Sequence, residues 1–322
     1  MSYITQVDFS ACSLGVANVS DEAYRAVGRD LFKQLSTVGF VYLTSTGVEE
    51  NLCENFNAVT KQFFLCPSDQ KMKYARRSNN NFGYNPMESE TLDITKPADL
   101  KEAFQAPAFT LKTQSSNDYS WPDDLAPGFF STYTEFMQVC IKLSKRVLTA
   151  LSFGMDLHES DFLTCFHEKL GTRGNSSALR TLYYPALAGD RQYKAGQLRC
   201  GEHSDYGSIT LLFQDGAGGL QVMNTCGEYV DAKPVPNSVI INIGDCLQFQ
   251  TQERLKSTKH RVLVPEESAS VIRRSLAFFV HQDDDVVVNQ PLRYGSDPKI
   301  TQPVEEPITA LQWLLKKFDA TY

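Results

Sequence analysis

The sequence predicts a single α+β protein with a helical first half and a β-rich second half. Apolar residues recur at helical spacing in long segments before residue 175, whereas short runs rich in β-branched and aromatic residues follow from about Leu179. Hydrophobic residues make up 42% and charged residues 21% of the 322 positions, so the chain can bury a core without disulfides. We expect one domain over residues 1–322, with a largely helical part (1–175), a β-rich core (176–285) and a C-terminal segment with a helix (286–322).

The helices are placed by their apolar stripes and by the residues that begin and end them. They are a first helix that Ser20 caps and Gly39 stops, a second that ends before Pro67, a third from about Pro127 to Gly154, and a last that starts near Pro307. The polar stretch from Ser78 to Pro97 between the second and third helices predicts a loop, and its length suggests a functional role.

The second half contains short β-rich runs that turn residues separate. These runs are Leu179–Tyr184, Ser208–Phe213, Leu220–Val222, Ser238–Ile243, Cys246–Gln250, Arg261–Val264 and Val271–Val280. Several short strands at this spacing favour a sandwich or barrel over a parallel sheet with crossover helices.

Charge and cysteine usage exclude several classes of protein. The formal net charge is −7 and no long run of like charges occurs, which argues against nucleic acid or an anionic membrane surface as a partner. The eight cysteines are scattered without zinc-site spacing, as expected of reduced thiols in the cytoplasm. No secretory signal and no apolar run of membrane-spanning length is visible. We expect a cytoplasmic monomer.

Two histidines and an aspartate form the candidate metal site. His203 and Asp205 stand two positions apart, and His260 follows on a later predicted strand. Spacing of two on a strand places both side chains on one face. Two imidazoles and a carboxylate are the ligands of the facial triad in non-haem iron(II) oxygenases. The pattern is weak on its own, because a lone histidine is more often structural.

A second pair strengthens this interpretation. Arg273 and Ser275 lie on one face of the last predicted strand, where a guanidinium and a hydroxyl can together hold a carboxylate. The alternative is that Arg273 is a surface charge, which is less attractive because the strand continues into the apolar run 276–279.

Motifs along almost the whole chain resemble the isopenicillin N synthase-like family of iron(II)/2-oxoglutarate dioxygenases. They are VDFS (7–10), VGFVYL (38–43), FGYNPMESETLD (82–93), KEAF (101–104), LRTLYYP (179–185), HSDYGSITLLFQD (203–215), GGLQV (218–222), STKHRV (257–262) and RRSLAFF (273–279). Their order along the chain is as specific as the motifs themselves.

The resemblance implies a distorted double-stranded β-helix, or jelly roll, with flanking helices. It implies that His203, Asp205 and His260 bind Fe(II), that Arg273 and Ser275 hold the distal carboxylate of 2-oxoglutarate, and that Tyr184 adds a hydrogen bond to this cosubstrate. One departure is Leu182, where many members have Asn, so the polar contact from that position is missing.

The implied reaction couples oxidative decarboxylation of 2-oxoglutarate to succinate with oxidation of a small organic substrate by O2. Hydroxylation, desaturation and oxidative cyclisation are all open outcomes, and ascorbate is the expected reductant. Two alternatives remain. The first is an oxidase of the same fold that does not consume 2-oxoglutarate, in which Arg273 and Ser275 would hold the substrate's own carboxylate. The second is a non-catalytic small-molecule binding protein.

The substrate pocket is expected between the segment from Asn79 to Asp93 and the chain after Asp283. Arg180 shares a strand face with Leu182 and Tyr184 and should lie in the same cavity. A buried guanidinium needs an anionic partner. That partner is either a substrate carboxylate, as in an amino acid derivative, or a nearby acidic residue of the protein.

The other histidines are assigned no chemistry. His158 and His167 flank a short expected helix and are interpreted as surface or packing residues. His281 ends the last strand and could approach the site, but a structural role is favoured.

Overall fold

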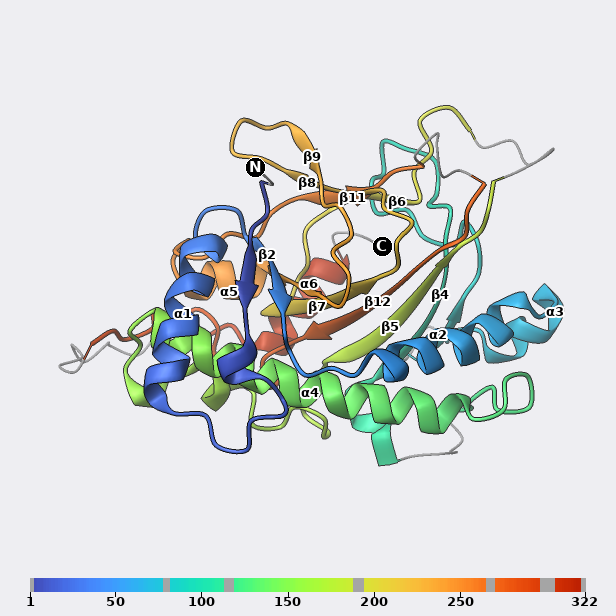
Figure 1. Cartoon of the computed structure of the whole chain (residues 1–322). Helices are drawn as coiled ribbons and strands as arrows, with labels where there is room; N and C mark the ends of the chain where they lie inside the picture. Colours follow the sequence, from blue (N-terminus) through green and yellow to red (C-terminus); the bar gives the residue numbers. More distant parts are fainter. Residues whose placement is uncertain are drawn as a thin grey trace.

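The computed structural model describes residues 3–77, 82–112, 119–187, 194–264, 270–295 and 305–319. Within these ranges, two β-sheets face each other and helices cover the outer face of the larger sheet (Figure 1). Apart from the parallel pair β1–β2, the ladders between strands in the described ranges are antiparallel, in line with the expected sandwich or barrel.

The larger sheet has eight strands in the described part of the chain. In spatial order they are β1 (Gln6–Asp8), β2 (Phe40–Thr44), β10 (Val239–Ile243), β7 (Ile209–Gln214), β12 (Arg273–Val280), β5 (Ala178–Tyr184), β4 (Glu102–Pro107) and β3 (Gly83–Asn85). The smaller sheet, likewise counted over the described residues, has four: β6 (Cys200–His203), β11 (His260–Val262), β8 (Leu220–Met223) and β9 (Tyr229–Asp231).

The α-helices are α1 (Asp21–Leu35), α2 (Glu50–Leu65), α3 (Ser68–Lys71), α4 (Phe129–Gly154), α5 (Asp245–Gln250) and α6 (Ala310–Asp319). Short 3₁₀ turns are η1 (Ser10–Cys12), η2 (Met72–Tyr74), η3 (Ala108–Lys112), η4 (Glu159–Asp161) and η5 (Leu163–Phe166). The expected cap is present, since the Ser20 hydroxyl accepts a hydrogen bond from the Ala23 amide at 3.2 Å. No helix among the described residues is long and apolar enough to span a bilayer.

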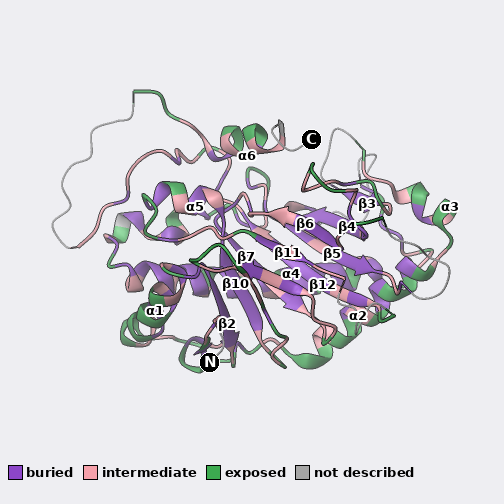
Figure 2. Cartoon of the chain, turned by 90° about the horizontal axis from the view of Figure 1, so that it is seen from above, coloured by how far each residue is buried: buried purple, intermediate pink, exposed green. Residues whose placement is uncertain are grey.

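The two faces of the larger sheet form two hydrophobic cores. Alternation along β5 sends Leu179 and Tyr183 to the core beneath α2 and α4, and Leu182 and Tyr184 to the core between the sheets. Figure 2 shows how buried residues gather in the strands and the inward faces of the helices. The larger sheet is therefore buried on both sides, and the site lies between the sheets.

Helices α1 and α4 cross where each carries a glycine. A β-carbon on Gly28 would lie 1.9 Å from the Ala150 carbonyl oxygen, and one on Gly154 would lie 2.0 Å from the Gly28 carbonyl oxygen. Only glycine permits this backbone approach.

The structure corrects the sequence prediction in three places. Strands β1 to β4 come from the part expected to be largely helical, and β3 lies inside the expected loop, of which residues 78–81 are outside the described range. Residues 245–250 form a helix, not a strand, because a short apolar run does not distinguish the two by periodicity. The last helix begins at Ala310 instead of near Pro307, since Thr309 and Gln312 cap it reciprocally at 2.9 and 3.2 Å.

Candidate active site

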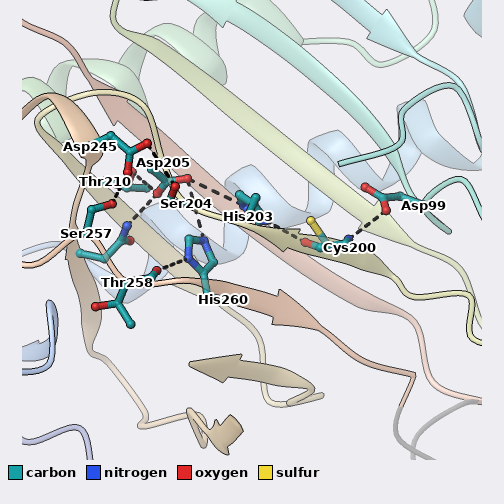
Figure 3. Close-up of polar contacts among 12 residues, drawn as sticks. Asp99, Cys200, His203, Ser204, Asp205, Thr210, Asp245, Ser257, Thr258 and His260 are labelled. Atoms are coloured by element: carbon teal, nitrogen blue, oxygen red, sulfur yellow. Dashed lines mark hydrogen bonds and ion pairs between the residues drawn. The ribbon is translucent and has the colours of Figure 1, made fainter. Parts of the chain in front are cut away.

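The predicted triad converges at one end of the smaller sheet (Figure 3). His203 and His260 are directly paired across β6 and β11, and their rings are 4.2 Å apart between centroids. Oδ1 of Asp205 lies 3.8 Å from Nε2 of His203 and 3.9 Å from Nε2 of His260. All three ligating atoms lie within 4.8 Å of one another, so a single ion can bind to them.

Asp205 does not reach this position from the strand. Strand β6 ends at His203, and Asp205 lies in the connection to β7, so the expectation that both residues share a strand face was wrong. The Asp205 carbonyl oxygen accepts a 2.7 Å hydrogen bond from the Asp245 amide, the first residue of α5. The connection is therefore fixed by backbone contacts.

Backbone carbonyls orient both imidazoles. Nδ1 of His203 lies 2.8 Å from the Gly201 carbonyl oxygen, and Nδ1 of His260 lies 3.0 Å from the Thr258 carbonyl oxygen. A carbonyl only accepts, so each Nδ1 carries the proton and each Nε2 keeps its lone pair for a metal.

The carboxylate of Asp205 is oriented in the same way. Its Oδ2 accepts hydrogen bonds from Oγ1 of Thr210 at 2.6 Å and from Nδ2 of Asn242 at 2.7 Å. Oδ1 is thereby left to face the two imidazoles. Sequence reasoning missed both donors, although an Asn inside the apolar run 239–243 is a signal of buried polar contact.

The charges of the triad suit a divalent cation. Burial, together with the neighbouring His260, lowers the pKa of His203 to about 3, so the ring is neutral at physiological pH. Burial opposes ionisation of Asp205, but His260, His203 and the two hydrogen-bond donors hold its pKa below the ordinary value. Two imidazole nitrogens and one carboxylate oxygen fit Fe(II) with coordination positions left open.

A layer of polar contacts lies behind the triad. Oγ of Ser204 donates to Oδ2 of Asp245 at 3.2 Å, and Oγ of Ser257 donates to Oδ1 of Asp245 at 2.6 Å (Figure 3). Nζ of Lys317, on α6, lies 2.6 Å from Oδ2 of the same carboxylate. Asp245 therefore connects the segments that carry the metal ligands to the C-terminal helix.

Arg273 and Ser275 lie side by side, as expected. Nη1 of Arg273 donates to Oγ of Ser275 at 3.1 Å, and Nε donates to the Gly218 carbonyl oxygen at 2.9 Å. The guanidinium carbon lies 4.8 Å from the ring centre of Tyr184, which pairs with Arg273 across β5 and β12. Arg273 is only 1% exposed, so the alternative of a surface charge was wrong.

A cavity of about 120 Å³ adjoins the triad. Its lining includes His203, Asp205 and, from the predicted pocket strand, Arg180 and Leu182. Leu92, from the expected pocket loop, also lines it, as do Leu314 and Phe318 of α6. Arg180 and Leu182 thus share the cavity with the metal site, while Tyr184 is buried next to Arg273.

The guanidinium of Arg180 has an acidic partner in the protein. Its Nη2 pairs with Oε2 of Glu90, and Nζ of Lys101 lies 3.5 Å from the same oxygen. Lys101 also pairs with Asp99. Although burial opposes ionisation, Arg180 and Lys101 lower the pKa of Glu90 to about 2. Of the two partners considered for Arg180, the protein side chain is therefore present.

The remaining histidines differ in position. His167 is fully buried and lies 2.6 Å from the Leu163 carbonyl oxygen and 2.9 Å from Oγ of Ser208, which is the packing role expected. His158 is half-buried. His281 lines the cavity together with His203 and Asp205, and burial lowers its pKa to about 4.

Comparison with known proteins agrees with this geometry. Residues 175–282 match the model of the 2OG-Fe(II) oxygenase superfamily. Residues 6–124 match a second model, that of the N-terminal region of the non-haem dioxygenase in morphine synthesis. The chain is 31% identical to the 2-oxoglutarate-Fe(II) type oxidoreductase ppzD of Metarhizium majus, over 92% of this chain and 90% of the relative. The chain belongs to the 2-oxoglutarate–Fe(II) oxygenase superfamily.

Further similarities span the oxygenase almost completely. It is 32% identical to the proline hydroxylase buaE of Petromyces alliaceus, over 91% of this chain and 92% of the relative. The crystal structure of a full-length Neurospora crassa protein in complex with alpha-KG aligns with a TM-score of 0.79 at 29% identity, covering 98% of this chain and 96% of that one. The fold is therefore the α+β jelly roll of this superfamily. The cofactors of the oxygenase are Fe(II), 2-oxoglutarate and O2.

Proposed function

We propose that this oxygenase binds Fe(II) through His203, Asp205 and His260 and binds 2-oxoglutarate through Arg273, Ser275 and Tyr184. The observation that carries the proposal is the free face of the triad. Hydrogen bonds occupy Nδ1 of both histidines and Oδ2 of Asp205, and the two Nε2 atoms and Oδ1 converge. A binding protein without metal chemistry has no need for such a convergence.

The protein's own groups perform distinct tasks in this proposal. Arg273 and Ser275 would anchor the distal carboxylate of 2-oxoglutarate with charge-assisted hydrogen bonds. The core between the sheets would exclude water from the cosubstrate, and the cavity lined by Leu182, Leu314 and Phe318 would orient the substrate. Fe(II), when bound, supplies the redox chemistry that couples oxidation of 2-oxoglutarate to oxidation of the substrate.

The test of this function is coupled turnover. The Fe(II)-loaded enzyme should release succinate from 2-oxoglutarate and consume O2, both faster when substrate is present. Arg273→Met should raise the KM for 2-oxoglutarate at least about tenfold, as expected for a lost charge-assisted contact of about 1.5–3 kcal/mol. Substrate oxidation that proceeds without 2-oxoglutarate would favour the alternative oxidase, in which Arg273 holds the substrate. Failure to bind Fe(II) would favour the non-catalytic alternative.

We propose an amino acid derivative as the class of substrate. Arg180 presents a guanidinium at the cavity, and its partner Glu90 keeps one buried oxygen, Oε1, without a hydrogen-bond partner. A donor next to a free acceptor suits a ligand that carries both a carboxylate and an N–H group. The relative buaE is named a proline hydroxylase, and the Neurospora crassa protein has also been crystallised with thymine, whose ring carries N–H groups.

Compounds in which a neutral amide replaces the carboxylate test the proposed class of substrate. Amino acid derivatives should stimulate succinate release, and the matching neutral amides should do so less well in the wild-type enzyme. Arg180→Leu should lower kcat/KM for the acid more than for its amide. Equal losses on the two compounds, or no loss, would contradict a role for Arg180 in binding the carboxylate.

We also propose that the enzyme is a cytoplasmic monomer. All eight cysteines are free thiols, as is usual in a reducing compartment. Sedimentation at micromolar concentration would test the oligomeric state, and a mass twice that of the chain would contradict it.

A further inference from the structure

Arg199 is a buried cation that the functions described so far do not use. It directly precedes β6, is 0% exposed, and donates one hydrogen bond, from Nη2 to the Val271 carbonyl oxygen at 2.8 Å. Its Nε and Nη1 atoms are buried without a hydrogen-bond partner, and among the described residues Arg199 forms no ion pair. An unpaired buried charge is strongly unfavourable, so we infer that Arg199 has an anionic partner that is not part of the protein.

The surroundings of Arg199 identify the end of the site to which it belongs. Its bonded partner Val271 lies two residues before Arg273, and burial together with the charge of Arg273 lowers the pKa of Arg199. Tyr184, the third cosubstrate residue, also interacts electrostatically with Arg199. Arg199 is thus bonded to the segment that leads into Arg273, and the two buried guanidinium groups interact electrostatically at the cosubstrate end.

The hydrogen bonds of Arg273 go to neutral groups, and the carboxylate of Asp215 already accepts hydrogen bonds from other groups. Arg273 donates to the Gly218 carbonyl and to the Ser275 hydroxyl, neither of which carries a charge. Asp215 attracts Arg199, but its oxygens accept hydrogen bonds from the Arg274 amide at 2.6 Å and the Ala217 amide at 3.1 Å. The protein groups around Arg199 and Arg273 therefore do not fully neutralise their positive charge.

We propose that Arg199 is a second guanidinium for the distal carboxylate of 2-oxoglutarate and binds it, together with Arg273, through Nε and Nη1. The inference rests on the proposed assignment of Arg273 and Ser275 to that carboxylate. A carboxylate has about four lone-pair sites, enough for donors from both arginines and from Ser275. Arg199 consequently favours a dicarboxylic 2-oxo acid over a monocarboxylic one.

The test compares two cosubstrates in four variants. The anaerobic Fe(II) protein is titrated with 2-oxoglutarate and, separately, with 2-oxobutanoate, which lacks the distal carboxylate. The variants are Arg199→Met, Arg199→Lys, Arg273→Met and the control Arg29→Met, whose side chain is exposed on α1. Dissociation constants and the ligand-induced change in Tm are both measured, so no readout depends on turnover.

Arg199→Met should weaken 2-oxoglutarate binding at least about tenfold and alter 2-oxobutanoate binding by less than about twofold, since a charge-assisted bond contributes about 1.5 kcal/mol or more. Arg199→Lys should recover part of the loss, and Arg29→Met should behave as wild type. Without ligand, Arg199→Met should keep or raise its Tm, because an unpaired buried charge has been removed.

Two results would overturn the inference. If Arg199→Met weakens both cosubstrates equally and lowers the Tm of the free protein, Arg199 is structural. If Arg199→Met leaves 2-oxoglutarate binding unchanged while Arg273→Met weakens it, the inference fails and the proposed function stands. Unchanged binding in Arg273→Met would instead contradict the proposed function itself.

Discussion

Asn242 donates a 2.7 Å hydrogen bond from Nδ2 to Oδ2 of Asp205, and this contact turns the other carboxylate oxygen toward the two histidines. Asn242 is 2% exposed and comes from β10, in the larger sheet, whereas His203 and His260 come from the smaller one. The orientation of the metal site therefore depends on both sheets of the jelly roll.

Replacing Asn242 should weaken metal binding without removing a ligand. Asn242→Leu leaves Asp205 with Thr210 as its remaining side-chain donor, so its carboxylate is less firmly oriented. Loss of such an outer contact typically lowers metal affinity about 10–100-fold. Fe(II) titration under anaerobic conditions measures the change, with Asn224→Leu on an exposed turn as the control. Wild-type affinity in Asn242→Leu would show that the contact does not orient the ligand.

Glu90 should stabilise the fold at neutral pH. Glu90→Gln leaves Arg180 and Lys101 without their shared carboxylate, and breaking a buried ion pair from one side costs about 3–5 kcal/mol. The folded-state pKa of Glu90 is about 2, below its ordinary value of 4.5, so the unfolded chain takes up the proton first as pH falls. The stabilisation is complete above pH 4.5 and is lost toward pH 2.

Urea unfolding of wild type and Glu90→Gln at several pH values checks the direction of this pH dependence. The difference in free energy of unfolding should be largest above pH 4.5 and shrink as the pH falls toward 2. A difference that grows in acid would contradict the ionised state of Glu90.

The inner face of α6 should contribute to substrate binding. Leu314 is buried and lines the cavity, whereas Leu311 on the same helix is 38% exposed and is not among the lining residues. Leu314→Ala should lower kcat/KM for the substrate by about 5- to 150-fold and leave Fe(II) and 2-oxoglutarate affinity unchanged, because a lost apolar contact in a pocket is worth roughly 1–3 kcal/mol. Leu311→Ala is the matched control. Equal kinetics for the two variants would exclude α6 from the substrate site.

His167 should make the fold sensitive to acid. Burial lowers its pKa to about 4 from an ordinary value of 6.5, so the unfolded chain binds the proton first between these values. Stability contributed by neutral His167 is present above pH 6.5 and is lost as the pH falls through about 4. His167→Gln should flatten the rise of Tm between pH 4 and 6.5, though not abolish it, since His281 shifts in the same direction. An unchanged slope would contradict burial of a neutral imidazole.

Sequence patterns located the long helices, most strands of the second half and the triad. Local rules were sufficient for a capped amphipathic helix such as α1. The triad depended on the order of motifs along the chain, because His-x-Asp is a weak pattern on its own and His260 lies on a later strand. Local rules failed for residues 245–250 and for β1 to β4, where three to six residues carry too little periodicity and pairing partners lie far along the chain.

The contacts that tune the site were also beyond sequence reasoning. Glu90 meets Arg180, and Asn242 meets Asp205, only after the sheets have formed. An isolated acidic residue in a polar segment, such as Glu90, gives no sign that it will be buried. The unpartnered donors of Arg199 likewise become visible only when its neighbours are known.

The most direct test of the central claim is formation of the ternary complex of protein, Fe(II) and 2-oxoglutarate without O2. Chelation of Fe(II) by a 2-oxo acid produces a visible charge-transfer absorption band. We expect the band in the wild-type protein, saturating at one 2-oxoglutarate per chain, and its loss in His260→Ala, with far-UV circular dichroism unchanged in the variant. Absence of the band in the folded wild-type protein, or an undiminished band in His260→Ala, would contradict the account.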